Sequence, residues 1–184
     1  MSLLNRHMKI TDETIREFLC SHANHITHWA VAHTHFHTYH ATNAEVLSMK
    51  TAAQKQVRHF LRTFNQFLYQ SKAHRKPQLY TPLVLTTIEF AKASPFKQET
   101  IHFNFALGNI PKNLTTEELR KIFEHCWVDK ANLSSKALWL KDAVQAENTN
   151  WLNYITKEAE TGNIETWDFE NTQIPHLALT ADIS

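Results

Sequence analysis

The sequence predicts an α+β fold in which a central antiparallel sheet carries helices on one face, of the ferredoxin-like type. Segments with alternating apolar residues and segments with apolar residues at helical spacing follow one another along the chain. After a short first helix, their order is strand, long helix, two strands, helix, strand and helix. The two middle strands are separated by one turn-like segment, which favours a hairpin.

The first half of the chain supplies the first helix, the first strand and the longest helix. Residues 10–20 begin with capping residue types and continue with apolar residues at helical spacing. Residues 25–40, HITHWAVAHTHFHTYH, are rich in aromatic and β-branched residues with partial alternation, which is typical of a strand. Residues 52–70 form the clearest amphipathic helix, with a recurring spacing of three to four between apolar residues.

The second half supplies the hairpin and the last three elements. We expect two strands, a helix, a strand and a helix over residues 79–91, 101–107, 115–127, 136–144 and 147–160. Thr115 and Glu118 form a capping-box pattern at the start of the middle helix. The 184 residues suffice for one domain, with its core at about 25–160, a C-terminal extension at 161–184 that lies along the surface, and no helicase domain.

The composition excludes several classes of protein. Gly108 and Gly162 are the only glycines, so the glycine-rich phosphate loops of ATPases, helicases and dehydrogenases are missing. No apolar run reaches the length of a membrane span. The unpatterned Cys20 and Cys126 predict free thiols in an intracellular protein. Residues 1–100 carry a net charge of +6 and residues 101–184 one of −5, so the first half is better suited to face phosphates.

Polar residues interrupt the second hairpin strand at two positions of one face. His102 and Asn104 are two residues apart, so they point to the same side, away from Phe103 and Phe105. Glu89 on the preceding strand can come alongside across the hairpin. An imidazole, an amide oxygen and a carboxylate are acceptable ligands for Mg²⁺ or Mn²⁺. By itself this short pattern more often marks the solvated face of a half-buried strand.

A second group of histidines lies earlier in the chain. His33, His35 and His37 share one face of a strand, with His40 just beyond. Three imidazoles can bind Zn²⁺, but alternate residues on a strand are about 6.6 Å apart and nearly collinear. We therefore interpret this group as substrate-facing or structural, with metal binding as the lesser alternative.

The last predicted helix carries the pattern YxxK. Tyr154 and Lys157 are three apart and share one helix face. A tyrosine hydroxyl titrates near pH 10, so it becomes an effective nucleophile only beside a metal ion or a cation that favours the phenolate. Taken alone, YxxK fits a helix face that simply packs on the sheet.

The order of these features along the chain indicates a function more specifically than any one of them does alone. An acidic strand residue, a polar pair on its hairpin partner and a later helix with YxxK resemble the HUH-type endonucleases, in particular the single-tyrosine rolling-circle replication initiators (Rep). AVAHTHFH resembles the family's first motif, IEFA the strand with its carboxylate, IHFNFAL its metal motif and WLNYITKE its nucleophile motif. The resemblance covers about residues 25–160, and the last motif is the most specific.

The resemblance implies a ferredoxin/RRM-like HUH endonuclease fold and a metal-dependent, site-specific nickase of single-stranded DNA. Glu89, His102 and Asn104 would hold Mg²⁺ or Mn²⁺ on the scissile phosphate. Tyr154 would attack that phosphate, giving a 5′-phosphotyrosyl link and a free 3′-hydroxyl, and Lys157 would stabilise charge beside the link. The family usually has two histidines in the metal motif; some members carry an amide at the second position, as Asn104 does here, and we expect weaker metal binding.

The resemblance also implies partners and a location. The expected partners are single-stranded or hairpin origin DNA, with a separate helicase and polymerase, and no membrane. We expect a monomer or weak oligomer in the cytoplasm of a bacterium or an infected host cell. DNA contacts are expected from basic and imidazole side chains, and Trp29 or Phe36 are candidates for base stacking. The DNA-binding candidates are His33, His35, His37, Arg58, Arg62, Lys72, Arg75 and Lys76.

Other functions remain open from the sequence. A single-tyrosine transposase or a mobilisation relaxase uses the same chemistry, although relaxases usually place their nucleophile near the amino terminus. A non-catalytic nucleic-acid-binding domain on the same fold and a histidine-rich zinc-binding protein are the alternatives from other classes.

Overall fold

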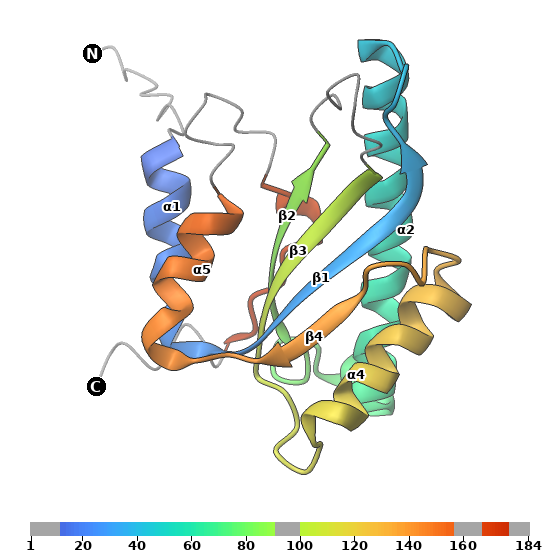
Figure 1. The fold of residues 1–184 in the computed structure, drawn as a ribbon. Helices are drawn as coiled ribbons and strands as arrows, with labels where there is room; N and C mark the ends of the chain where they lie inside the picture. The colour runs from blue at the N-terminus through green and yellow to red at the C-terminus, as the bar shows by residue number, and fades with distance from the viewer. Residues whose placement is uncertain (1–11, 91–99, 157–166, 177–184) are drawn as a thin grey trace, which may run out of the picture.

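A four-stranded antiparallel sheet forms the centre of the molecule (Figure 1). The computed structural model describes residues 12–90, 100–156 and 167–176. The strands are β1 (Ile26–His37), β2 (Leu83–Glu89), β3 (Thr100–Gly108) and β4 (Trp139–Asp142). Their order is β2-β3-β1-β4, and every neighbouring pair is antiparallel. The α+β class and the pairing of the two middle strands, both predicted from the sequence, are confirmed.

Two helical connections cross one face of the sheet. The helix α2 (Asn43–Tyr69) and the short α3 (Ser71–Arg75) join β1 to β2, while α4 (Thr116–Glu124) and a π-helical turn (His125–Lys130) join β3 to β4. Because β3 lies between β1 and β2, the first connection is a split β-α-β unit. The helix α2 begins nine residues before the predicted range, at Asn43, because Thr42 and Glu45 form a capping box that the sequence interpretation overlooked.

The larger part of the core lies between this face and α2. Alternate residues of β1 and β3, including Ala30, Ala32, Phe103 and Phe105, are fully buried there. They pack against an aromatic group from the helices, made up of Phe60, Phe64, Phe123 and Trp127. Small alanines on β1 opposite large phenylalanines on β3 let the long helix approach the twisted sheet closely.

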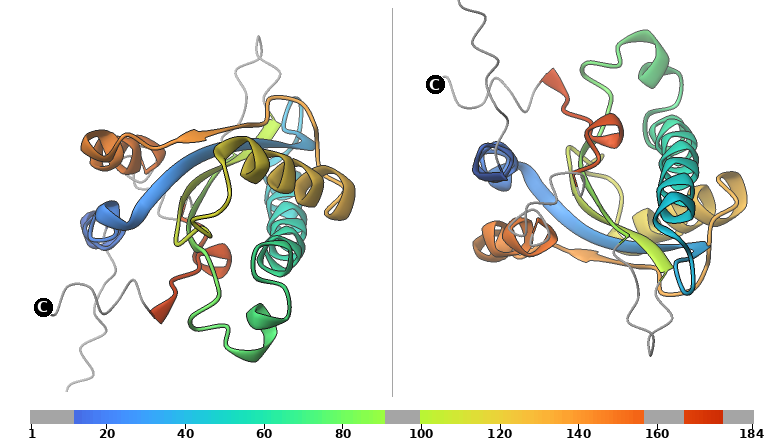
Figure 2. Two further views of the ribbon diagram at one scale, coloured as in Figure 1. Left: turned by 90° about the horizontal axis from the view of Figure 1, so that it is seen from below. Right: turned by 90° about the horizontal axis from the view of Figure 1, so that it is seen from above.

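The opposite face of the sheet is also covered by helices, over part of its length. The helices α1 (Asp12–Cys20) and α5 (Asn148–Ile155) contact each other at this side, away from α2 and α4 (Figure 2). They bury Trp29, Leu83, Leu85 and Ala106, which form a second core cluster with residues of both helices. The expectation that helices cover one face only is therefore wrong. β2 is apolar on both faces over its first half, as strands covered on both sides are.

Residues 167–176 pack on the free edge of β2. Trp167 and Gln173 form bridges with Thr87 and Val84 of this strand, and a 3₁₀ turn (Phe169–Asn171) lies between them. Asp168 is fully buried and accepts hydrogen bonds from Gln54 (3.0 Å) and Asn171 (2.6 Å); burial raises the pKa of its carboxyl group. The described part of the C-terminal extension is thus bound to the edge strand, which it protects from pairing with other chains. Two further 3₁₀ turns span Ala23–His25 and Gln145–Glu147.

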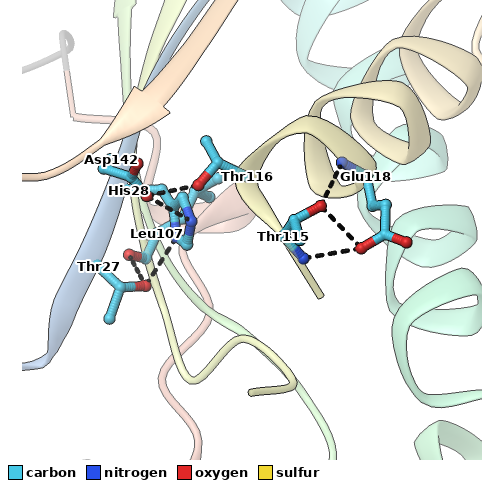
Figure 3. A network of polar contacts seen from close by, with 7 residues as sticks. All are labelled: Thr27, His28, Leu107, Thr115, Thr116, Glu118 and Asp142. Atoms are coloured by element: carbon cyan, nitrogen blue, oxygen red, sulfur yellow. Dashed lines mark hydrogen bonds and ion pairs between the residues drawn. The ribbon is translucent and has the colours of Figure 1, made fainter. Parts of the chain in front are cut away.

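The start of α4 is held by its own capping box and by β4 (Figure 3). Thr115 and Glu118 bond reciprocally, as the sequence predicts. Thr116 donates to the carboxylate of Asp142 at 2.5 Å, and His28 of β1 lies 3.5 Å from the same oxygen. The N-terminus of α4 is therefore linked to the end of β4 and to β1.

Replacing Thr115 by alanine should lower the free energy of unfolding by about 1 kcal/mol, because the backbone N–H of Glu118 loses its acceptor and the Glu118 carboxylate loses the hydroxyl donor. Urea unfolding followed by circular dichroism measures the loss. Thr51→Ala, an exposed change within α2, is the matched control and should have little effect. Equal losses in both variants would contradict the capping role.

Stability should fall in acid because of His28. Burial lowers the pKa of His28 below its ordinary value of 6.5, and Asp142 only partly opposes the shift. In the unfolded chain the His28 ring therefore binds a proton more readily than in the folded chain. The stability contributed by the neutral ring is present above pH 6.5 and is lost as the pH falls through the lower folded-state pKa. Urea unfolding at pH 7.5 and 5 should show a smaller acid loss for His28→Gln than for the parent chain.

Candidate active site

The three predicted metal ligands meet on two neighbouring rungs of the sheet. Glu89 of β2 lies directly opposite His102 of β3, and His102 lies opposite His33 of β1. Asn104 is on the next rung, between Thr87 and Val31. Residues opposite each other in a rung point to the same face, so all of these side chains lie on the face that α1 and α5 partly cover.

Direct contacts join the three side chains. The amide of Asn104 donates to Oε1 of Glu89 at 2.9 Å, and Nε2 of His102 lies 3.3 Å from Oε2 of the same carboxylate. Asn104 is 1% exposed, whereas the His102 and Glu89 side chains keep 24% and 12% of their surface. The carboxylate therefore lies between an imidazole and an amide, at the edge of solvent. The expectation that Glu89 comes alongside across the hairpin is confirmed.

The ring of His102 lies between a backbone carbonyl and the Glu89 carboxylate. Its Nδ1 lies 3.3 Å from the carbonyl oxygen of Thr100, which can only accept a hydrogen bond, so a proton on Nδ1 satisfies this contact. In the neutral ring Nε2 then carries a lone pair that faces a carboxylate oxygen. Two acceptors at this distance need a proton or a metal ion between them, and histidines that bind metals commonly bond a backbone carbonyl through the other nitrogen.

Asn104 fits a metal only after a change of orientation. Its amide nitrogen, not its oxygen, faces Glu89 and also lies 3.4 Å from the hydroxyl of Thr87. A half turn of the amide would present Oδ1 toward the carboxylate, where it could serve as a hard oxygen ligand. Within the described ranges, no group of three or more His, Cys, Asp or Glu side chains is arranged to hold a metal ion, so a site here depends on this amide.

His33 is brought next to the predicted ligands by the pairing of β1 with β3. Its ring stacks on that of His102, with centroids 4.7 Å apart, and its Nδ1 lies 2.6 Å from the hydroxyl of Thr100. Burial and the neighbouring His102 lower the pKa of His33, while Glu89 raises it. The lowered pKa favours the neutral form of His33, which avoids repulsion between the stacked rings.

The other histidines of the run line a pocket beside this group. His35 and His37 are exposed, and with His33 they border a cavity of about 290 Å³. The rest of its wall comes from Thr34, Thr100, Ser134, Ser135 and Lys136. His33 thus contacts a predicted ligand, and all three histidines line the pocket.

Tyr154 lies on the helix that packs on the same face. Leu152 and Ile155 of α5 are buried in the second core cluster, whereas Tyr154 is 52% exposed. The start of α5 is anchored by Asn148, which accepts a hydrogen bond from the Trp29 indole (2.8 Å) and donates to the carbonyl of Ile26 (3.1 Å). The phenol is therefore accessible on a helix fixed to β1. Lys157 lies outside the described residues.

The predicted basic DNA contacts lie elsewhere. Arg58 and Arg62 are on α2, which packs on the opposite face of the sheet, and Arg58 pairs with Glu170 of the C-terminal segment. Lys72 and Arg75 belong to α3, and Lys76 follows it. The structure does not bring these five cations together with Glu89 and His102.

Residues that the sequence interpretation missed stand beside Tyr154. Trp139 and Lys141 of β4 share the face of Trp29 and are exposed, and Trp151 of α5 lies between Trp29 and Tyr154. Trp29 itself is 3% exposed, and Phe36 packs at the margin of the main core, so neither presents a free ring for stacking on a base. The alternation of Trp139 and Lys141 in KALWLKDAV was a signal that could have located the exposed pair.

Comparisons with known proteins do not assign the chain to a family. Family models, curated proteins and solved structures all give no match. None of the helices in the described part has the length and apolar character that crossing a membrane requires.

Proposed function

We propose that this chain is a single-tyrosine, HUH-type endonuclease that nicks single-stranded DNA and so initiates rolling-circle replication of a plasmid, phage or mobile element. One observation carries the proposal. Glu89, His102 and Asn104 meet on one face of the sheet, and the helix that bears the exposed Tyr154 packs on that same face. A common face is a requirement for a phenol to attack a phosphate held at these three side chains.

The donor set suits a hard divalent cation, Mg²⁺ or Mn²⁺, held by Glu89, His102 and the turned amide of Asn104. When bound, such an ion polarises the scissile phosphate and neutralises its charge. The backbone carbonyl of Thr100 keeps Nε2 of His102 directed at the site, and the stacked ring of His33 limits the movement of the His102 ring.

Tyr154 then performs the transfer. Its Oη forms a bond to phosphorus, the bond from phosphorus to the 3′-oxygen breaks, and the phenolic proton is lost to solvent while the leaving oxygen gains one. The products are a 5′-phosphotyrosyl link and a 3′-hydroxyl that a polymerase can extend. Attack by a later 3′-hydroxyl reverses the step and closes the strand. Lys157, three residues after Tyr154 in the sequence, is proposed to stabilise the charge of the linked phosphate.

The expected substrate and partners follow from this reaction. The substrate is single-stranded or hairpin origin DNA, and a separate helicase and polymerase would act on the nicked product in the cytoplasm of a bacterium or infected cell. The chain would act as a monomer or weak oligomer. A single-tyrosine transposase or mobilisation relaxase would use the same residues.

A second function, a non-catalytic DNA-binding domain, is favoured by the orientation of Asn104. With its nitrogen on Glu89, and with a proton between Nε2 of His102 and the carboxylate, the three side chains satisfy one another without a metal. The two proposals differ in one product. The protein is incubated with Mn²⁺ and a fluorescent pool of single-stranded oligonucleotides of randomised sequence, and denaturing electrophoresis detects a covalent adduct. Adduct that EDTA prevents supports the endonuclease, whereas binding without adduct supports the binding domain.

A further inference from the structure

A tryptophan lies exposed on the same rung of the sheet as Asn104. The register places Trp139 opposite Val31 and Val31 opposite Asn104, so the three side chains point to one face. Trp139 is 36% exposed and lies two strands from Asn104, which is about 10 Å at the usual spacing of neighbouring strands. An extended DNA strand with a phosphate at Glu89 and His102 reaches this tryptophan within a few nucleotides.

Trp139 belongs to a group of aromatic rings that includes the proposed nucleophile. The ring of Trp151 lies 5.6 Å from that of Trp139 and 5.7 Å from that of Tyr154, as centroid distances. We call Trp139, Trp151 and Tyr154 the aromatic patch. Trp151 is supported from below by the buried Trp29, on which it stacks at 5.4 Å. The patch therefore has a buried base and two exposed rings, those of Trp139 and Tyr154.

A cation accompanies the patch. Nζ of Lys141 lies 5.5 Å from the centroid of Trp139 and 5.0 Å from that of Trp29, and Lys141 is exposed. Exposed aromatic rings beside an ammonium group match the two parts of a nucleotide, a flat base and a negative phosphate. Large exposed apolar rings in one cluster commonly mark a binding surface rather than a structural need.

We propose that the aromatic patch binds unpaired bases of single-stranded DNA next to the scissile phosphate, with Lys141 close to the DNA backbone. That the bound bases lie next to a scissile phosphate rests on the proposed function. That the patch stacks on bases does not depend on it. Only an unpaired strand offers base faces to a protein ring, so the patch selects single-stranded over duplex DNA. Stacking depends little on base identity, so the patch supplies affinity rather than sequence specificity.

The test compares two probes and two substitutions at one position. Fluorescence anisotropy measures binding of an oligothymidylate of about 20 nucleotides, longer than the sites that small domains usually cover, and of an abasic strand of the same length. Trp139→Ala should weaken binding of the thymidylate about tenfold and leave the weaker binding of the abasic strand unchanged. Trp139→Phe, which keeps a ring, should recover most of the affinity. Circular dichroism checks that each variant is folded.

Phe169→Ala is the matched control, because Phe169 is 70% exposed on the segment that packs beside β2, apart from the patch, and its removal should leave binding unchanged. The proposal is overturned if the parent chain does not bind thymidylate, if Trp139→Ala binds as tightly as the parent, or if the loss is the same on the abasic strand. Adduct formation is scored separately. If binding depends on Trp139 but no adduct forms, the stacking proposal is supported and the endonuclease proposal is rejected. If adduct forms but Trp139→Ala binds as tightly as the parent, the endonuclease proposal is supported and the stacking proposal is rejected.

Discussion

Replacement of Tyr154 by phenylalanine should abolish the covalent protein–DNA adduct while binding of single-stranded DNA is retained. The change removes only the hydroxyl oxygen that would attack phosphorus, and the ring that stacks on Trp151 stays in place. Removal of a nucleophile commonly lowers the rate of a reaction by several orders of magnitude. Denaturing electrophoresis of labelled DNA after incubation with Mn²⁺ measures the adduct, and anisotropy measures the binding.

Tyr39→Phe is the matched control, because Tyr39 is also an exposed tyrosine but follows β1 instead of lying on α5. Its adduct yield should equal that of the parent chain. Adduct formed by Tyr154→Phe at the parent rate would show that another residue is the nucleophile, and the assignment of α5 as the catalytic helix would be wrong.

Replacement of His102 by alanine should lower both the affinity for Mn²⁺ and the yield of adduct by at least about 100-fold. Removal of a residue that only supports a metal ligand already lowers metal affinity or activity by up to that factor. The variant also leaves the Glu89 carboxylate without its imidazole neighbour and His33 without its stacking partner. Calorimetric titration with Mn²⁺ measures the affinity. Thermal unfolding without metal measures any loss of stability, so that a misfolded variant is recognised.

An exposed histidine on α2, His59, provides the control for this change. His59→Ala should bind Mn²⁺ and form adduct as the parent chain does. If folded His102→Ala retained the parent affinity for Mn²⁺, the ion would be bound elsewhere, and the rung of Glu89 and His102 would have no metal-binding role.

The hairpin of the proposed site could be predicted because its information is local. Residues 79–91 and 101–107 are both apolar and adjacent in the chain, and a short connection between such strands favours antiparallel pairing. The period of two then places His102 and Asn104 on one side and Phe103 on the other. The structure confirms both the pairing and the contact of Glu89 with His102.

The neighbours of the site could not be predicted in the same way because they come from distant segments. His33 meets His102 through the pairing of β1 with β3, across a separation of nearly seventy residues. Trp139 faces the site only because β4 pairs with the other edge of β1. The basic residues of α2 looked suitable for DNA, but the apolar stripe of this helix packs on the opposite face of the sheet.

The sequence alone predicts the class of fold and the order of its elements. It also predicts the side of the strand to which Glu89, His102 and Asn104 point, because periodicity and turn chemistry act over a few residues. Tertiary structure decided that helices cover both faces, that α5 carries Tyr154 to the face of the predicted metal ligands, and that the amide nitrogen of Asn104 turns toward Glu89. These outcomes depend on which apolar surfaces find each other in the folded chain, and such pairings are not encoded in any short segment.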